Sequence, residues 1–338
     1  MSKRVTLADV ARRAGLSPTT VSMVLNDRPN ARIPSETAER VRQAADELNY
    51  VPDATARELR TGRTQTIGFL SDEVTLTRYA SAMIRGILDA GDARDQVVVM
   101  AEADQHWSRL ERAIALLRSR RVDGLLFGLM RARLVELPGL DGSLPGLIIN
   151  GRAEGLRSVL PDEYQAGRAA VAHLVAHGHR RIAFIGRSPS HLDPAVSVTI
   201  GRRLAGIDEG MAEAGLRFVD EAPGHDWEPD LGYAGASAIL QRSPQVTAIL
   251  AANDRIAFGV YQAAQASGRS LPDELSVMSF DDEQLAGYLR PGVTTMQLPY
   301  LAMGRAGMEL ILDGDLTGPE VLVPMPLIER DSVRPAAD

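Results

Sequence analysis

The sequence predicts a small all-α head followed by a larger α/β body built on parallel sheets. The chain has 338 residues, which is too long for one ordinary core and suits two or three domains. Residues 1–50 show helical periodicity with capping signals, whereas from Thr64 onward short apolar runs alternate with amphipathic stretches. Apolar strands that alternate with helices are typical of parallel sheets covered on both faces, and this many units suggests two sheets.

The first helix is predicted over Leu7–Ala14. Thr6 can cap its N-terminus, and Asp9 at the third helical position can reach back to it as in a capping box. Gly15 and Leu16 then form a short turn, because glycine readily takes the backbone conformation that ends a helix.

A second helix is predicted from Pro18 to Leu25, with Ser17 as its cap and Asn26 at its end. Proline suits the first helical position, because the N–H that it lacks would have no partner there. A third helix, expected over residues 35–49, closes a three-helix core. Two short helices joined by a glycine turn are the plan of a helix-turn-helix.

The body begins with the first of eight apolar runs, and these are the predicted strands: Thr66–Leu70, Val97–Ala101, Gly124–Leu129, Gly146–Asn150, Arg181–Gly186, Thr247–Asn253, Leu275–Asp281 and Thr294–Leu298. The clearest amphipathic stretches between them are predicted helices: Arg109–Arg120, Tyr164–His177, Arg203–Ala214 and Asp254–Gly268. Ligands of open α/β sheets bind at the carboxyl ends of the strands, so polar residues there are candidates for binding.

The charge of the chain is informative only when it is divided between head and body. A net charge of −7 argues at first against a nucleic-acid partner. Residues 1–64, however, hold eleven basic and eight acidic side chains, so the head carries +3 and the remainder −10. A mildly basic head on an acidic body is a common layout for a DNA-binding module fused to another domain.

Several classes of protein are excluded by composition and motif. No run of 18 apolar residues predicts a membrane span, and Asp9 interrupts the apolar stretch that an export signal needs, so we expect a cytoplasmic protein without a membrane partner. The chain has no cysteine, which excludes disulfides and thiolate metal sites. The enzyme motifs GxxxxGKS/T, GxGxxG, GxSxG and HExxH are absent, so we expect neither enzyme activity nor a cofactor.

The segment AHLVAHGHRRI contains three closely spaced histidines. His173 and His177 stand one helical turn apart, which is compatible with a metal, and His179 follows closely. The neighbouring sequence supplies no acidic or thiolate third ligand. We therefore expect structural histidines and no metal site.

The stretch VTLADVARRAGLSPTTVSMVLN, followed by IPSETAERVRQAADELNYVPDATARELRTG, resembles the headpiece and hinge of the lactose-repressor (LacI) family of bacterial regulators. The resemblance is almost continuous over these residues and looser over the rest of the chain. It implies a helix-turn-helix headpiece at 1–50, a hinge helix at 51–63, and a periplasmic-binding-protein-like core of two parallel-sheet subdomains at 64–338. The N-lobe would comprise about 64–161 and 297–323, and the C-lobe about 163–293 and 326–338.

The resemblance also implies which head residues contact DNA. Bases would be read by Pro18, Thr19, Ser22 and Met23, and phosphates would be contacted by Thr6, Ser17, Thr20 and Asn26. Family members often carry a polar or aromatic residue in place of Pro18 and an arginine in place of Met23. Neither Pro18 nor Met23 can make a bidentate hydrogen bond to a base edge. Readout is therefore expected to rest on Thr19 and on apolar contact with thymine methyl groups.

Residues 52–59 resemble the family's hinge helix, which is disordered until it meets DNA. Leu59 matches the wedge that enters the minor groove and kinks a pyrimidine–purine step. Ala56 is small enough to lie in the groove, and Arg57 can reach a phosphate or a base edge there. Eight residues are too few for a stable isolated helix, which fits folding on binding. The alternative is a plain linker with an incidental leucine.

The predicted ligand residues follow from strand ends and from the resemblance together: Tyr79, Asn150, Arg203, Trp227, Asn253, Asp281 and Tyr300. Aromatic rings against the apolar face of a pyranose, with charged and amide groups for its hydroxyls, make a sugar site. The same residues could stack a purine. The loop SDEVTLTRYA resembles a subgroup of actinobacterial-type regulators that respond to sugars, which favours a saccharide.

These features predict a regulator of transcription, expected to be a repressor, that binds a pseudo-palindromic operator in double-stranded DNA under control of a small effector. A homodimer is expected, because no leucine heptad follows the last predicted strand. One alternative is a solute-binding protein of sugar transport, which the hinge segment and the lack of an export signal disfavour. The other is an α/β enzyme such as a dehydrogenase, which the missing dinucleotide fingerprint disfavours.

Overall fold

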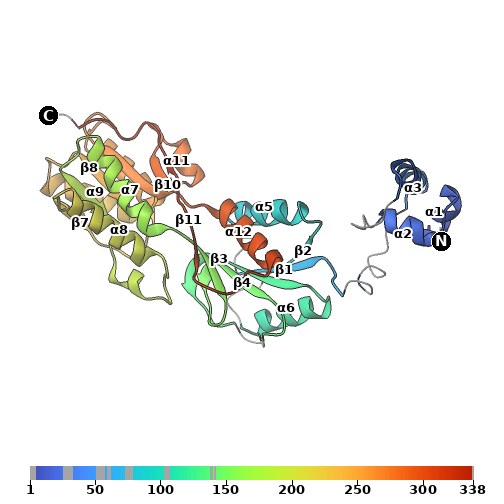
Figure 1. Ribbon diagram of the computed structural model, residues 1–338. Coiled ribbons are helices and arrows are strands. Elements are labelled where there is room, and N and C mark those ends of the chain that lie inside the picture. The colour runs from blue at the N-terminus through green and yellow to red at the C-terminus, as the bar shows by residue number, and fades with distance from the viewer. Residues whose placement is uncertain are drawn as a thin grey trace. The chain divides into compact units, whose positions relative to one another are not determined.

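The computed structural model describes residues 5–25, 33–50, 58, 62–72, 79–102, 107–137, 140 and 142–336. The chain forms two compact units, Met1–Thr64 and Gln65–Asp338, which are coloured along the chain in Figure 1. In the part of the chain that the structure describes, no helix is both long and apolar enough to cross a membrane.

The first unit is a cluster of three helices, α1 (Leu7–Ala14), α2 (Pro18–Leu25) and α3 (Ser35–Glu47). Its core takes one fully buried valine from each helix, namely Val10, Val21 and Val41. The helix-turn-helix predicted from the sequence is confirmed. The third helix ends two residues earlier than expected.

The starts of the first two helices follow from side-chain caps. Asp9 accepts hydrogen bonds from the N–H of Thr6 at 2.9 Å and from its hydroxyl at 2.7 Å. Gly15 ends α1 in the left-handed conformation at φ 66°. Ser17 begins α2, because its hydroxyl oxygen accepts the N–H of Thr20 at 3.1 Å. These caps satisfy N–H groups that have no partner inside the helices.

The second unit contains two six-stranded sheets, and we call the part built on the first sheet the N-lobe. Its strand order is β11-β5-β4-β3-β1-β2, and all of its pairs are parallel. The strands are β1 (Thr66–Ser71), β2 (Val97–Glu102), β3 (Gly124–Leu134), β4 (Gly146–Arg152), β5 (Arg157–Pro161) and β11 (Val321–Val323). The helices of this lobe are α5 (Tyr79–Asp92), α6 (Trp107–Ser119) and α12 (Tyr300–Asp313).

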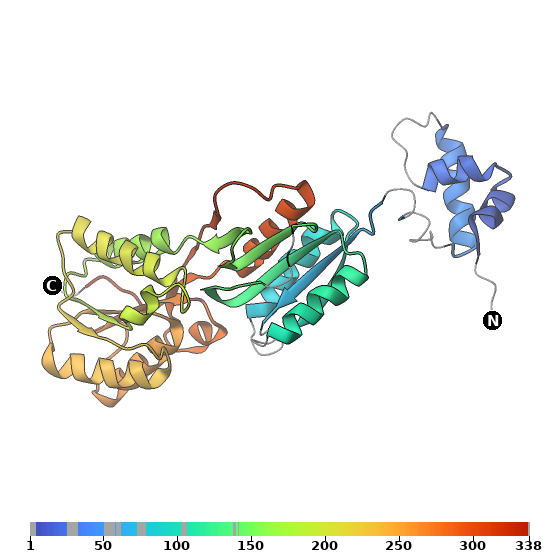
Figure 2. The same ribbon diagram turned by 90° about the horizontal axis from the view of Figure 1, so that it is seen from below.

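Helices cover both faces of the N-lobe sheet, as the turned view in Figure 2 shows. Successive residues of β3 point to opposite faces, so Leu126 packs against α5 and α12 while Leu125 and Phe127 pack against α6. This arrangement buries the central strands on both sides, which explains the apolar runs Gly124–Met130 of β3 and Gly146–Ile149 of β4. The two edge strands are more exposed: Val97 and Met100 of β2 are 61% and 51% exposed, and Leu322 of β11 is 41% exposed.

The C-lobe is built on the second sheet, with the order β12-β10-β9-β8-β6-β7. Its pairs are parallel except for β10 with β12. The strands are β6 (Ile182–Ile185), β7 (Asp220–Ala222), β8 (Ala248–Ala251), β9 (Ser276–Asp281), β10 (Thr294–Gln297) and β12 (Leu327–Ile328). The helices are α7 (Glu163–Ala176), η1 (Pro189–Leu192), α8 (Ile200–Glu213), α9 (Pro229–Arg242), α10 (Asp254–Ala266) and α11 (Gln284–Tyr288).

The chain passes between the two sheets at three places. It leaves the N-lobe between β5 and α7, returns between β10 and α12, and crosses again between β11 and β12. Because β10 (Thr294–Gln297) belongs to the second sheet, the middle crossing follows residue 297. All eight predicted strands are present, and the structure adds the short strands β5, β7, β11 and β12.

Helices α7 and α8 approach so closely that only glycine fits between their backbones. A Cβ atom on Gly206 would lie 2.0 Å from the carbonyl oxygen of Tyr164, and one on Gly167 would lie 2.4 Å from that of Arg203. Backbone atoms cannot move away as a side chain would. The close approach brings the first turns of the two helices together, and with them Glu163 and Arg203.

We predict that Gly206→Ala lowers the free energy of unfolding by about 1–3 kcal/mol or more, since 1–3 kcal/mol is the usual cost of overpacking. Urea denaturation of the full chain measures this. Gly287→Ala is the matched control, because a Cβ atom on this glycine of α11 would meet nothing within 4 Å. Alanine there should leave stability unchanged or raise it by up to about 1 kcal/mol. Equal losses in the two variants would refute the packing argument.

Candidate effector cavity and DNA-binding helix

A cavity of about 600 Å³ lies between the two lobes, at the carboxyl ends of strands from both sheets. Six of the seven predicted ligand residues line it: Asn150, Arg203, Trp227, Asn253, Asp281 and Tyr300. The seventh, Tyr79, is the first residue of α5, and its side chain lies outside the described part of the chain. The structure thus brings together residues that are far apart in the sequence.

Arg203 is the centre of the cavity's hydrogen bonding, although its side chain is only 1% exposed. Its Nε and Nη2 donate to the two carboxylate oxygens of Glu163 at 2.6 and 2.7 Å. Nη1 donates to the carbonyl oxygen of Ala252 at 2.7 Å, and Nη2 also donates to Asp281 at 3.2 Å. The guanidinium stacks 4.4 Å from the ring centre of Phe280. These bonds use four of its five N–H donors and leave one on Nη1 for a ligand.

The buried charges of this cluster shift the pKa values of Arg203 and Asp281. Burial acts to lower the pKa of Arg203, but the carboxylates of Glu163 and Asp281 outweigh it and raise that pKa, so the guanidinium stays charged. Burial raises the pKa of Asp281 to about 6, although Arg203 acts in the opposite direction. Two carboxylates therefore share one buried arginine.

A second arginine repeats this arrangement at the rim of the cavity. Arg255 donates to Glu228 at 2.8 Å and to Glu283 at 3.2 Å. With Arg131, the cavity is lined by three arginines and four carboxylates. Its charge is close to balanced and slightly negative, so it offers no net attraction to an anionic ligand.

Two of the polar residues sit in strained backbone. Asn150 and Asp281 have φ angles of 58° and 102°, a region that residues other than glycine rarely adopt. The side-chain amide of Asn150 donates to the carbonyl oxygen of Leu129 at 2.8 Å. Such strain is concentrated at functional sites, where the surrounding structure maintains it. Asn150 also lies within β4, which runs two residues beyond the predicted strand end.

The aromatic residues are held by their polar ends. Trp227 donates its indole N–H to the carbonyl oxygen of Gly186 at 2.8 Å, and the ring of His191 lies edge-on at 4.5 Å between ring centres. The hydroxyl of Tyr300 donates to the carbonyl oxygen of Met130 at 3.3 Å, which joins α12 to β3. Burial raises the pKa of Tyr300, so its hydroxyl stays protonated and remains a donor.

Asn253 has a structural role as well as a place in the cavity wall. Its side-chain oxygen accepts the N–H of Ile256 at 2.9 Å and so caps α10. Its amide nitrogen donates to the carbonyl oxygen of Trp227 at 3.1 Å. The amide nitrogen has a second N–H that can donate a hydrogen bond to a ligand.

Sequence reasoning missed several residues of the cavity. The most important is Glu163, which follows the strand β5 that was also missed. Its only signal in the sequence was its place between the expected end of the N-lobe segment, near residue 161, and the helix predicted over Tyr164–His177. The other missed polar residues of the wall are Arg131, His191, Ser197, Thr199, His225, Glu228, Arg255 and Glu283.

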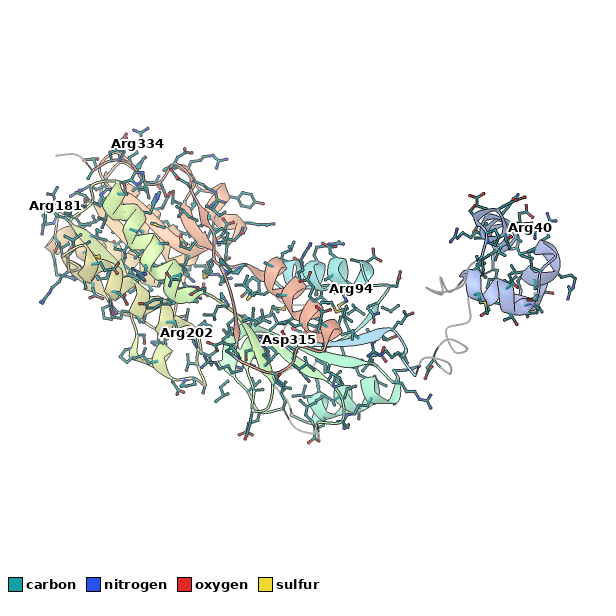
Figure 3. The ribbon with its side chains drawn as sticks, viewed as in Figure 1. Arg40, Arg94, Arg181, Arg202, Asp315 and Arg334 are labelled. Atoms are coloured by element: carbon teal, nitrogen blue, oxygen red, sulfur yellow. The ribbon has the colours of Figure 1, made fainter. Side chains whose placement is uncertain are left out.

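The two lobes are also bonded directly beside the cavity. The N–H of Val198 donates to the carbonyl oxygen of Ala132 at 2.7 Å, and the N–H of Leu134 donates to that of Pro194 at 2.8 Å. Arg202 on α8, labelled in Figure 3, forms an ion pair with Glu320 of the N-lobe. These contacts connect the N-lobe to the C-lobe beside the cavity.

The first unit presents α2 with one buried and one open face. Val21 and Val24 are buried, whereas Ser17, Pro18 and Thr19 are exposed. Thr6 is exposed as well, and Thr20, Ser22 and Met23 are half-buried. The residues predicted to contact DNA and described by the structure thus leave the core to other side chains.

The remaining predicted DNA contacts cannot be compared with the structure. Asn26, Ala56, Arg57 and Leu59 lie outside the described residues. Their roles stay predictions from the resemblance.

A helix-turn-helix unit followed by a two-lobed α/β unit with a polar cavity defines a transcriptional regulator that responds to a small ligand. A family model described as bacterial regulatory proteins, lacI family, matches residues 6–53, and one described as periplasmic binding protein-like domain matches residues 171–333. The HTH-type transcriptional repressor PurR of Erwinia tasmaniensis is 31% identical over 338 residues, covering 97% of this chain and 96% of that protein. The chain belongs to the LacI family.

Two solved structures extend this comparison. The Lac repressor dimer bound to operator and the anti-inducer ONPF matches with a TM-score of 0.70 and 26% identity, covering 98% of this chain and 99% of that one. The complex of the transcriptional regulator CelR with cellobiose matches with a TM-score of 0.63 and 28% identity, covering 98% and 100%. The protein is therefore a DNA-binding transcriptional regulator and not an enzyme, as the sequence predicted.

Proposed function

We propose that this regulator is a repressor whose effector is a neutral saccharide bound in the cavity between the lobes. The balanced charge of the cavity wall carries this proposal, because each of Arg203 and Arg255 is already neutralised by two carboxylates. A phosphorylated or otherwise anionic ligand would find no unpaired cation in either cluster. A sugar needs many donors and acceptors with little net charge, and the wall provides them.

Specific groups support hydrogen bonding to hydroxyls. The carboxylate of Asp281 can accept from a ligand, and the remaining hydrogens on Arg203 and Asn253 can be donated to one. Trp227 provides an apolar surface beside them. The cellobiose complex of CelR is a precedent for a sugar in a protein of this family.

The effector acts, in this proposal, by changing the balance between lobe arrangements. A ligand that contacts both walls binds the closed arrangement better and shifts the population toward it. The contact of Val198 with Ala132 and that of Leu134 with Pro194 break when the lobes open. Coupling of about 1–3 kcal/mol between effector and operator is the usual scale for such links.

For DNA binding we propose the residues on the open face of α2 together with the hinge. The side chains facing base edges would be those of Pro18, Thr19, Ser22 and Met23. Phosphates would be contacted by Thr6, Ser17, Thr20 and Asn26. Residues 51–63 would form the hinge helix on the operator. The head charge of +3 supports this assignment, because a Debye length of about 8 Å keeps distant acidic residues from cancelling it.

A homodimer would place two headpieces on a pseudo-palindromic operator. Strand β2 is our proposed contact surface, because an edge strand with exposed Val97 and Met100 is a ready site for association.

We predict that Met100→Lys weakens the dimer at least about tenfold, as measured by sedimentation, and lowers operator affinity as a consequence. Val219→Lys on the C-lobe edge is the control, since Val219 is also exposed, at 39%. Unchanged assembly of the Met100 variant would exclude β2.

The proposed function is tested by titrating the full chain with operator fragments selected from genomic DNA. Sugars and purine bases are then added in separate arms, and binding is followed by mobility shift and calorimetry. We expect one neutral sugar to change operator affinity and Asp281→Asn to weaken the binding of that sugar. A response to a purine base alone would replace the saccharide with a nucleobase. Operator binding that survives removal of residues 1–62 would refute the DNA-binding assignment.

A further inference from the structure

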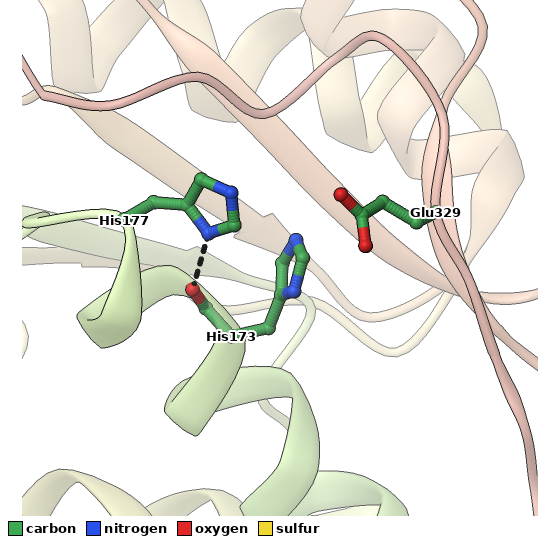
Figure 4. A group of neighbouring side chains, drawn as sticks. All are labelled: His173, His177 and Glu329. Carbon is green, nitrogen blue, oxygen red and sulfur yellow. Dashed lines mark hydrogen bonds between the residues drawn. The ribbon is translucent and has the colours of Figure 1, made fainter.

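Three side chains that could hold a metal ion meet on the C-lobe, away from the cavity wall. His173 belongs to the last turn of α7, His177 follows that helix directly, and Glu329 follows β12. One ligand atom from each lies within 4.8 Å of the others. Figure 4 shows the two imidazoles and the carboxylate facing a common space.

The structure orients both imidazoles toward that space. Nδ1 of His177 lies 2.8 Å from the carbonyl oxygen of His173 and can only be the donor there, so Nε2 of His177 carries the lone pair in the neutral ring. A histidine that binds metal through one nitrogen commonly donates from the other to a carbonyl in this way. The two rings are 4.4 Å apart between their centres.

His173 adds an independent indication. Its Nε2 is buried and has no hydrogen-bond partner among the described residues. A buried polar atom without a partner costs about 1–3 kcal/mol, so such atoms need an explanation. A cation between the three side chains would provide the missing partner.

Glu329 is the ligand that the sequence did not reveal. The sequence next to the histidines contains no acidic third group, but the fold brings the carboxylate of Glu329 beside them, because the chain returns to α7 only after the last lobe crossing. The N–H of Ala336 donates to the carbonyl oxygen of His177 at 2.8 Å, and Nε2 of His179 lies 2.9 Å from that of Arg334. These bonds hold the C-terminal segment, which contains Glu329, beside the end of α7.

We propose that His173, His177 and Glu329 bind a zinc ion that fastens the C-terminal segment to α7. Two imidazoles and one carboxylate form a known zinc ligand set, with a fourth position left for water. Tetrahedral zinc with bonds of about 2.0–2.2 Å brings its ligand atoms to about 3.4 Å of one another. The ligand atoms, which lie within 4.8 Å of one another, must therefore approach by at most about 1.4 Å.

The site is separate from the effector cavity. Helix α7 runs from Glu163, which binds Arg203 in the cavity, to the histidines at its other end. Fourteen residues of helix span about 21 Å. Zinc should therefore stabilise the C-lobe without competing with the effector. The end of a helix that carries its free carbonyl groups also favours a cation.

The experiment uses the full chain without an affinity tag, after dialysis against a chelator. Calorimetric titration with zinc chloride should show one site per chain, and zinc should raise the melting temperature. His177→Ala and Glu329→Gln should each weaken zinc binding by at least about tenfold. Cobalt(II) in place of zinc should give visible d–d absorption that Glu329→Gln changes.

His225→Ala is the matched control, because His225 lies in the wall of the effector cavity and is not one of the three side chains that form the proposed site. This variant should bind zinc as the unaltered chain does. The melting temperatures of the metal-free variants show whether each still folds. Absence of saturable zinc binding overturns the proposal, and so does binding that His177→Ala and Glu329→Gln leave unchanged.

Discussion

Arg203→Ala should lower the free energy of unfolding by about 3–5 kcal/mol, because it leaves two buried carboxylates without their counter-charge. Glu163 is 2% exposed and bonded to Arg203 through both oxygens, and Asp281 is 14% exposed. Ionised groups in such a place are far costlier without a partner than with one. Urea denaturation of the full chain at neutral pH measures the loss.

The neighbouring arginine provides the control for this prediction. Arg202→Ala removes an ion pair with Glu320, but the side chain of Arg202 is 31% exposed, so the loss should stay below about 1 kcal/mol. Equal losses for Arg202→Ala and Arg203→Ala would show that the buried cluster does not stabilise the fold.

The loss in Arg203→Ala should also depend on pH. Burial already raises the pKa of Asp281 to about 6 in the presence of Arg203, and removing that cation must raise it further. A carboxyl whose pKa is higher in the folded state than in the unfolded state makes the protein less stable as the pH rises from the lower pKa to the higher one. The deficit should therefore be larger at pH 8 than at pH 5. A deficit that is independent of pH would point to lost packing instead of buried charge.

Leu59→Ala should weaken specific operator binding by about 10–100-fold while nonspecific DNA binding changes little. The wedge proposed at this position is useful only where the operator is kinked, and unstacking one base step costs a few kcal/mol that the inserted side chains offset. Parallel titrations with operator and with unrelated DNA at the same salt concentration separate the two effects.

The conservative control for the hinge is Leu59→Met, which keeps a long apolar side chain. This variant should retain most of the specific affinity. Equal losses on operator and unrelated DNA in Leu59→Ala would remove the wedge role and leave residues 52–59 as a linker.

The local parts of the fold were predictable because their signals span only a few residues. Caps such as Thr6 with Asp9, and apolar runs such as Thr66–Leu70, can be identified without knowledge of the rest of the chain. The short strands β5, β7, β11 and β12, which have two to five residues each, were not predicted. Their places at or near the sheet edges depend on neighbours from distant parts of the sequence.

The residues of the effector cavity were likewise predictable only in part from the sequence. Asp281 was predicted from its place at a strand end, and Arg203 and Trp227 from the resemblance. Glu163 was missed, although it makes the shortest bonds to Arg203, because its role exists only when α7 and α8 meet through Gly167 and Gly206. The roles of all these residues in binding stay predictions until an effector is measured.

By itself the sequence determined the class of this protein: a basic helix-turn-helix head of +3 on an acidic α/β body of −10. Capping, periodicity and the residues at strand ends were enough, since each is a property of neighbouring residues. Only the tertiary structure decided which charges meet, as it pairs Glu163 with Arg203 across 40 positions and brings Glu329 to His173 and His177. Such contacts depend on where the crossings return the chain, and no local pattern encodes that.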